Sequence, residues 1–145
     1  MSRADPARGG ADAGAAPVRL TLPATPESLA VVRQALTAMA EVLGLGEAVL
    51  DDLRVAVTEA CTNAVVHAYP LCDGGAPGPL EVHAWPHHGG IVVMVRDQGE
   101  GLSPRDANAS AGLGLGLQLI ATLAAEVRIA SGPGRGTAIW MTFRA

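Results

Sequence analysis

Two helical patterns follow one another directly in this chain, and no strand pattern separates them. Apolar side chains recur at helical spacing from Leu29 to Leu43, where Gly44 ends the run, and again from Val49 to Ala64. A doubly wound parallel sheet needs strands and helices in strict alternation, so this order excludes that architecture. A largely antiparallel sheet is favoured instead.

The predicted strands fall on both sides of the helical patterns and form two hairpins. In chain order they cover 18–22, 80–85, 91–95, 127–130 and 137–143. The predicted helices cover 26–43, 46–68 and 113–125. The order β-α-α-β-β-loop-α-β-β predicts an α+β two-layer sandwich, in which one mixed, largely antiparallel sheet carries the helices on one face.

The 145 residues fit one domain, with residues 1–16 predicted as a disordered tail and 17–145 as the folded part. The formal net charge is -4, and all 10 basic residues are arginines scattered along the chain. Direct nucleic-acid binding is not expected, because it would require a basic patch. The absence of lysine also excludes a Walker A loop and the nucleotide-binding strand of eukaryotic-type protein kinases.

The N-terminal stretch lacks the apolar segment of a signal peptide. The most apolar stretch, 112–127, is too short and too interrupted by polar residues to span a bilayer. The two cysteines, Cys61 and Cys72, show no metal-binding spacing. We therefore expect a cytoplasmic protein with reduced thiols and no membrane association.

The second predicted helix carries a polar face. Glu59 and Asn63 are four residues apart, so they share this face, and His67 follows one turn later. An amide oxygen is a suitable ligand for magnesium, and a carboxylate one turn away can accept a proton. The alternative is a solvated polar face, in which His67 only packs or caps the helix end.

Three glycine-rich clusters follow, and an ordinary turn or hinge is the alternative for each. Asp97–Gly101, with the pattern D-x-G-x-G, comes directly after a predicted strand, where a carboxylate can accept from the amine of a base. Gly112–Gly116, with the pattern G-x-G-x-G, opens the third helix, and free N–H groups at a helix start suit a phosphate. Gly134–Thr137, with the pattern G-x-G-T, lies in the last hairpin.

The order of these four clusters is far more specific than any one of them. E-x-x-x-N, D-x-G-x-G, G-x-G-x-G and G-x-G-T, in that order, resemble the N, G1, G2 and G3 boxes of the GHKL ATPases, which share the Bergerat-type ATP-binding fold. The run from Glu59 to Tyr69 looks most similar to the anti-sigma-factor serine/threonine kinases. The resemblance covers about residues 18–144.

The resemblance implies roles for five polar residues. Glu59 would be the general base, and Asn63 would hold Mg²⁺. Asp97 would bind the adenine amine of ATP, helped by Thr137 and a water. Arg105 would lie in a lid over ATP, where it either reaches the terminal phosphate or is solvated.

The resemblance also implies roles for the glycines. Gly99 and Gly101 would flank the adenine base. Residues 102–111 would form the lid. The phosphates would be cradled by Gly112, Gly114 and Gly116.

By the same resemblance, the chain would be an ATP-dependent serine/threonine protein kinase and an anti-sigma factor. It would sequester a sigma factor, phosphorylate a STAS-type anti-anti-sigma protein and form a homodimer. Two alternatives stay open: a non-catalytic ATP-binding partner-switch module, and the catalytic domain of a sensor histidine kinase. The latter is disfavoured because no histidine precedes the second helix to serve as phosphoacceptor.

Overall fold

The structure, a computed structural model, describes residues 17–68, 77–99 and 111–145. The strands within these ranges are β1 (Val18–Pro23), β2 (Pro79–His87), β3 (Gly90–Asp97), β4 (Glu126–Ser131) and β5 (Thr137–Phe143). The helices are α1 (Pro26–Val42), α2 (Glu47–Asn63), its π-helical continuation η2 (Ala64–Ala68), and α4 (Ala111–Leu123). The predicted order of elements is confirmed.

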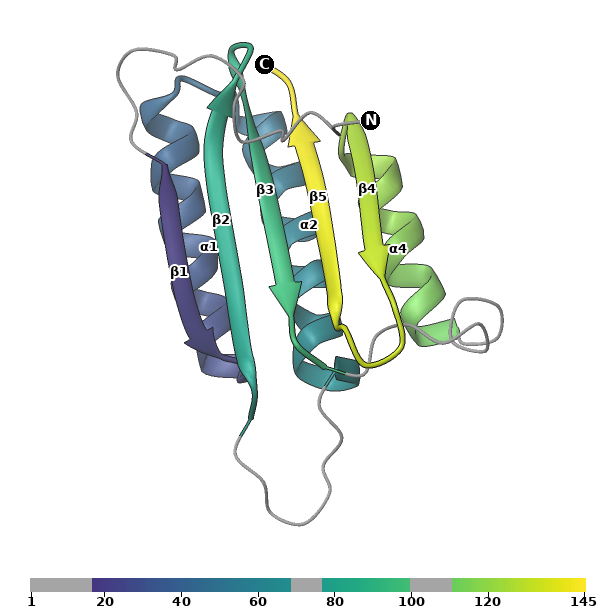
Figure 1. The fold of residues 1–145 in the computed structure, drawn as a ribbon. Coiled ribbons are helices and arrows are strands. Elements are labelled where there is room, and N and C mark those ends of the chain that lie inside the picture. The colour runs from purple at the N-terminus through teal and green to yellow at the C-terminus, as the bar shows by residue number, and fades with distance from the viewer. Residues whose placement is uncertain (1–16, 69–76, 100–110) are drawn as a thin grey trace, which may run out of the picture.

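The strands form one sheet in the order β1-β2-β3-β5-β4. All four described pairings are antiparallel, so the sheet is more uniform than the mixed, largely antiparallel one that was predicted. The helices cover one face of this sheet (Figure 1). The predicted α+β two-layer sandwich is therefore confirmed.

The core lies between the two layers, because each strand turns alternate side chains toward the helices. Along β2 every second residue is buried, including Val82 and Ala84. These side chains share one cluster with buried residues of the helices, such as Leu36, Leu53 and Ile120. Full burial of a side chain such as leucine contributes about 1.5–3 kcal/mol relative to leaving it in water.

Cys61 belongs to this core as a free cysteine. Burial raises the pKa of its thiol to about 12. The group therefore stays a protonated, unreactive thiol at neutral pH, because the thiolate is the reactive form. Cys72 lies outside the described residues.

The face of the sheet away from the helices is covered at its centre by large side chains. Val92 and Met94 of β3 point to this face and are only 5% and 4% exposed. Trp85 of β2 is paired in register with Val92, and Trp140 of β5 is paired with Met94. Such cross-strand neighbours touch, so we infer that the two indole rings shield the middle of the sheet.

The ends of α1 agree with the sequence pattern only in part. Gly44 has a φ of 77°, the left-handed conformation in which glycine commonly ends a helix. At the other end, Thr25 is of a residue type that commonly caps a helix, but its side chain forms no capping bond to the backbone. Its hydroxyl lies 3.2 Å from the Ser28 hydroxyl instead. A pair of hydroxyls thus stands in place of a side-chain cap at the start of α1.

The second predicted helix, 46–68, is not α-helical throughout. Regular α-helix ends at Asn63, and a wider π-helical turn continues to Ala68. Apolar periodicity does not distinguish these two geometries over a single turn, which explains the difference. Single π-helical turns occur frequently at functional sites, and this one begins directly after Asn63.

Candidate active site

Two groups of polar side chains gather at the same end of the molecule. The end of α2 lies there beside the end of β3 and the start of β5 (Figure 1). One group lies on the strand ends, and the other lies where α2 meets α4. The two groups contain most of the predicted site residues that the structure describes.

The strand-end group is a row of three residues from three neighbouring strands. Asp97 ends β3, Thr137 begins β5 and Ser131 ends β4. The register pairs Asp97 with Thr137, and Thr137 with Ser131. The antiparallel order of these strands therefore brings together residues that are far apart in the sequence.

The Asp97 carboxylate is buried and oriented by the backbone. It is 8% exposed, and the N–H of Gly99 donates to its Oδ1 at 2.9 Å. Burial raises the pKa of Asp97 above its ordinary value, while backbone N–H donors at Gly99 and Thr137 lower it in part. A carboxylate held in this way keeps acceptor positions for a ligand that brings a donor, such as the amine of adenine.

Gly136 joins the last hairpin to the Asp97 turn by close backbone contact. Its φ is 73°, and a Cβ there would lie 2.1 Å from the carbonyl oxygen of Asp97. Gly134 in the same hairpin has a similar φ of 70°, but a Cβ there would meet nothing within 4 Å. The final glycine of G-x-G-T is therefore required for two reasons: its left-handed conformation, and the lack of room for a side chain beside the Asp97 carbonyl.

We expect Gly136→Ala to lower the free energy of unfolding by about 2–4 kcal/mol, because it adds a backbone clash to the strain of a left-handed alanine. Gly134→Ala is the matched control and should lower it by only about 1–2 kcal/mol, the strain alone. Urea denaturation of both variants measures the difference. Equal losses in the two variants would show that the close approach of the Asp97 carbonyl adds no cost to a side chain at position 136.

The second group lies on the side of α2 that faces α4. Glu59 and Asn63 are both half-buried there. A Cβ on Gly116 of α4 would lie 3.2 Å from Glu59 Oε2 and 3.5 Å from Asn63 Oδ1. Gly116 therefore lets the backbone of α4 come close to both polar groups. The structure brings together two clusters that are well separated in the sequence.

The Asn63 amide is the unusual member of this group. Its Nδ2 is buried and has no hydrogen-bond partner within the described part of the chain. A buried donor without a partner costs about 1–3 kcal/mol, so its presence calls for a functional explanation. Rotation of the amide by half a turn exchanges nitrogen and oxygen, so the same position can present a hard oxygen ligand to a cation.

The remaining predicted site residues are only partly described. Helix α4 begins at Ala111, two residues before the predicted start at Leu113, so Gly112 and Gly114 lie in its first turn. Gly101, Arg105 and residues 102–110 of the predicted lid lie outside the described residues, as does the N-terminal tail. The side chain of His67 is likewise outside them.

Ser131 is a residue of this site that sequence reasoning missed. Its Oγ lies 2.9 Å from Oγ1 of Thr137. Serine at a strand end next to a glycine-rich turn is ordinary, so its residue type alone carries no signal. The signal that could have found it is the hairpin itself, since pairing of 126–131 with 137–142 sets Ser131 opposite Thr137.

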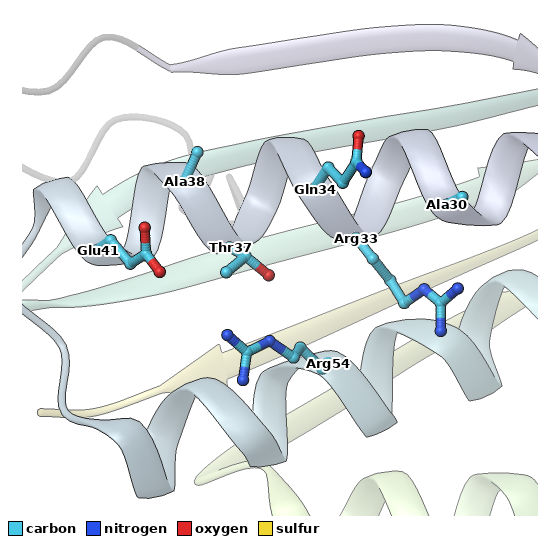
Figure 2. Close-up of a pocket in the computed structure, with 7 residues that line it drawn as sticks. All are labelled: Ala30, Arg33, Gln34, Thr37, Ala38, Glu41 and Arg54. Carbon is cyan, nitrogen blue, oxygen red and sulfur yellow. The ribbon is translucent and has the colours of Figure 1, made fainter.

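A separate groove of about 430 Å³ lies between α1 and α2. Arg33 from α1 and Arg54 from α2 extend into the space between the helices (Figure 2). Arg54 forms an ion pair with Asp51 at 2.9 Å on its own helix. The full lining is Ala30, Arg33, Gln34, Thr37, Ala38, Glu41 and Arg54. This set includes none of the predicted site residues.

In the portions that the structure describes, no three or more His, Cys, Asp or Glu residues come together as a metal site. No helix in the same portions is long and apolar enough to cross a membrane.

These features place the chain in the class of two-layer α+β domains built on one antiparallel sheet, with a cluster of polar side chains at one end of it. The sequence profile of the family described as "Histidine kinase-like ATPase domain" matches residues 22–143. The chain belongs to this family, and the membership supports ATP binding.

Its curated relatives include proteins named "Serine-protein kinase RsbW". The one from Bacillus pumilus (strain SAFR-032) is 35% identical over 82 residues, which are 57% of this chain and 50% of that protein. The one from Bacillus subtilis (strain 168) is 32% identical over 83 residues, which are again 57% of this chain and 50% of that protein. The chain thus spans about half the length of the curated relatives it matches.

Solved structures show the same fold. The RsbU and RsbW domains of a Mycobacterium tuberculosis protein match with a TM-score of 0.67 and 30% identity, over 89% of this chain and 32% of that one. A histidine kinase domain from Erythrobacter litoralis matches with a TM-score of 0.55 and 21% identity, over 84% of this chain and 61% of that one. The second likeness concerns the fold alone.

Proposed function

We propose that the chain is an ATP-dependent serine/threonine protein kinase of the cytoplasm that acts as an anti-sigma factor. In this proposal it sequesters a sigma factor and phosphorylates a STAS-type anti-anti-sigma protein, and it works as a homodimer. The observation that carries the proposal is the approach of Gly116 to Glu59 and Asn63, which brings a glycine-rich helix start to a carboxylate and an amide. The similarity to proteins named as serine-protein kinases supports the class of reaction.

The strand-end group supports recognition of the adenine base. The Asp97 carboxylate accepts from backbone N–H groups on one side and has further lone pairs for the adenine amine. Thr137 lies beside it with its hydroxyl, and Gly99 forms the adjacent turn without a side chain to block the base. In this proposal Asp97 and Thr137 orient ATP so that its phosphates run toward α2 and α4.

The phosphate end is assigned to α2 and to the start of α4. Free N–H groups in the first turn of α4, at Gly112 and Gly114, suit an anion. The chemistry of Asn63 fits a magnesium ion, because its buried amide has an unsatisfied polar atom and can present an oxygen. When bound, Mg²⁺ would supply positive charge that neutralises the phosphates.

Glu59 is assigned as the general base. It lies one helical turn before Asn63 and is half-buried against Gly116. In this role its carboxylate orients the serine or threonine hydroxyl of the partner protein and accepts the proton as the oxygen attacks the terminal phosphorus. The bond between that phosphorus and the oxygen that bridges the β- and γ-phosphates of ATP breaks in the same step, and ADP leaves with this oxygen.

We expect Asp97→Asn to weaken ADP binding by about tenfold and to narrow the preference for ADP over GDP, because it removes a charged acceptor facing the adenine amine. Calorimetric titration with each nucleotide measures both effects, and thermal unfolding checks that the variant is folded. An unaltered ratio of the ADP and GDP dissociation constants would show that Asp97 does not take part in recognising the base.

The proposed function is tested by affinity purification of the chain from its native host, with and without ATP. Mass spectrometry identifies the bound proteins, and labelled ATP reports phosphate on them. We expect a sigma factor, together with serine or threonine phosphate on a small co-purifying protein. Nucleotide binding with neither partner would overturn the anti-sigma assignment, and light scattering of the purified chain tests the homodimer.

A further inference from the structure

The face of the sheet away from the helices holds both tryptophans of the chain, and Figure 1 shows this face in front. Trp85 and Trp140 are half-buried there, beside the buried side chains of Val92 and Met94. A hollow of about 110 Å³ opens on the same face, and its lining is His87, Val92, Glu126, Arg128, Trp140 and Thr142. Tryptophan and arginine are enriched where protein surfaces bind one another, so this face has the side chains of a docking surface.

The carboxylates on this face are already paired. Within the described strands they are Glu81 of β2 and Glu126 of β4. Nη1 of Arg96 lies 3.6 Å from Oε2 of Glu81, and Arg144 forms an ion pair with Glu126. Neither carboxylate is therefore left to neutralise a further cation on this face.

Two arginines of the same face have no such partner. Cross-strand pairing sets Arg19 of β1, Met94, Trp140 and Arg128 of β4 in one row across the sheet. Arg19 and Arg128 are exposed, and neither forms an ion pair with a residue that the structure describes. Four strand spacings separate them, about 19 Å, which an extended segment of about six residues spans.

The helices on the other side of the sheet carry the opposite charge. Helices α1 and α2 hold Glu27, Glu41, Glu47, Asp51, Asp52 and Glu59 against the two arginines Arg33 and Arg54. An acidic partner is therefore repelled by the helical layer and attracted to the sheet face. A second copy is a poorer occupant, because a two-fold contact would bring the same positive face against this one. Contact with the helical layer of a second copy would be head-to-tail and would not close as a dimer.

We propose that this face binds an extended acidic segment of another protein, with carboxylates at Arg19 and Arg128 and an apolar side chain in the hollow beside Trp140. The inference goes beyond the proposed kinase function and does not depend on the nucleotide site. Asp97 of that site follows Arg96 on β3, and successive side chains of a strand point to opposite faces.

The test is titration of the full chain with a synthetic peptide in which two glutamates, about six residues apart, flank leucine and alanine. Both tryptophans lie on this face, so intrinsic fluorescence reports binding there. The matched peptide has lysine in place of both glutamates. We expect a saturable change with the glutamate peptide that weakens as salt is added, and no change with the lysine peptide.

The double variant Arg19→Gln/Arg128→Gln should bind the glutamate peptide roughly twofold to thirtyfold more weakly, the worth of two exposed ion pairs. Arg33→Gln is the matched control, because it removes an exposed arginine from α1, and its affinity should equal that of the parent. Thermal unfolding and titration with ADP check that the fold and the nucleotide site are unchanged in each variant.

Equal behaviour of the two peptides, whether both bind or neither does, would overturn the inference, as would equal affinities of the double variant and the parent. A shift of the parent's tryptophan emission on dilution from dimer to monomer would also overturn it, because a second copy would then cover the face. Tighter binding of a short single-stranded oligonucleotide than of the glutamate peptide would do the same. Failure of the parent to bind ADP, by contrast, would overturn the proposed function alone.

Discussion

Glu59→Gln is expected to leave Mg·ATP binding in place and to slow phosphoryl transfer to the partner protein by about 10²–10⁴-fold, the usual contribution of a general base. Glutamine has the shape of glutamate, so the close approach of Gly116 to this side chain is retained. It cannot accept the hydroxyl proton, because its amide is not basic. Single-turnover transfer from labelled ATP measures the effect without interference from product release.

The control for this variant is Glu41→Gln, which makes the same change on α1. Glu41 is exposed and lines the groove between α1 and α2. We expect its transfer rate to equal that of the parent. Transfer at the parent rate in Glu59→Gln would mean that another group accepts the proton. A parent chain that binds ATP and transfers nothing would favour the alternative of a non-catalytic partner-switch module.

Asn63→Ala is expected to weaken ATP binding by roughly tenfold to a hundredfold when magnesium is present, the worth of a contact to a charged group. With the metal chelated, parent and variant should bind ATP about equally, because the lost contact is to the metal. The folding stability should be retained, since Asn63 Nδ2 has no partner to lose among the described residues. Calorimetric titration in magnesium and in chelator measures both affinities.

Thr62→Ala is the control for the asparagine variant. Within the part of the chain that the structure describes, the hydroxyl of the neighbouring Thr62 bonds to the carbonyl of Thr58 on its own helix, so its loss should not change the magnesium dependence. If Asn63→Ala kept the full magnesium effect on ATP affinity, the assignment of this residue to the metal would be wrong. Circular dichroism, recorded before any titration, checks that the variant is folded.

The layers of this fold were predictable because burial is periodic. Helical spacing from Leu29 to Leu43 and strict alternation along β2 report the face that each element buries. The helical and strand order then excluded a parallel sheet. The π-helical turn after Asn63 was not predictable, because apolar spacing is nearly the same in the two helix types over five residues.

The candidate site was predictable as an ordered set of residues, and the way in which the fold brings these residues together was not. Four motifs in the right order indicate a nucleotide site, but they do not show which glycine of α4 meets α2. Packing of the two helices selects Gly116, the third glycine of its motif. Similarly, the place of Ser131 beside Thr137 depends on the register of a hairpin, which residue type alone does not reveal.

We propose that nucleotide binds where α2 and α4 meet the ends of β3 and β5. The most direct test is an NMR titration of the labelled chain with Mg·ADP, followed through the backbone amides. We predict the largest shifts at Gly99, Gly116 and Thr137, with Arg33 and Arg54 of the α1–α2 groove unmoved. Largest shifts at those two arginines, or saturation of the titration without change at Thr137, would contradict the account.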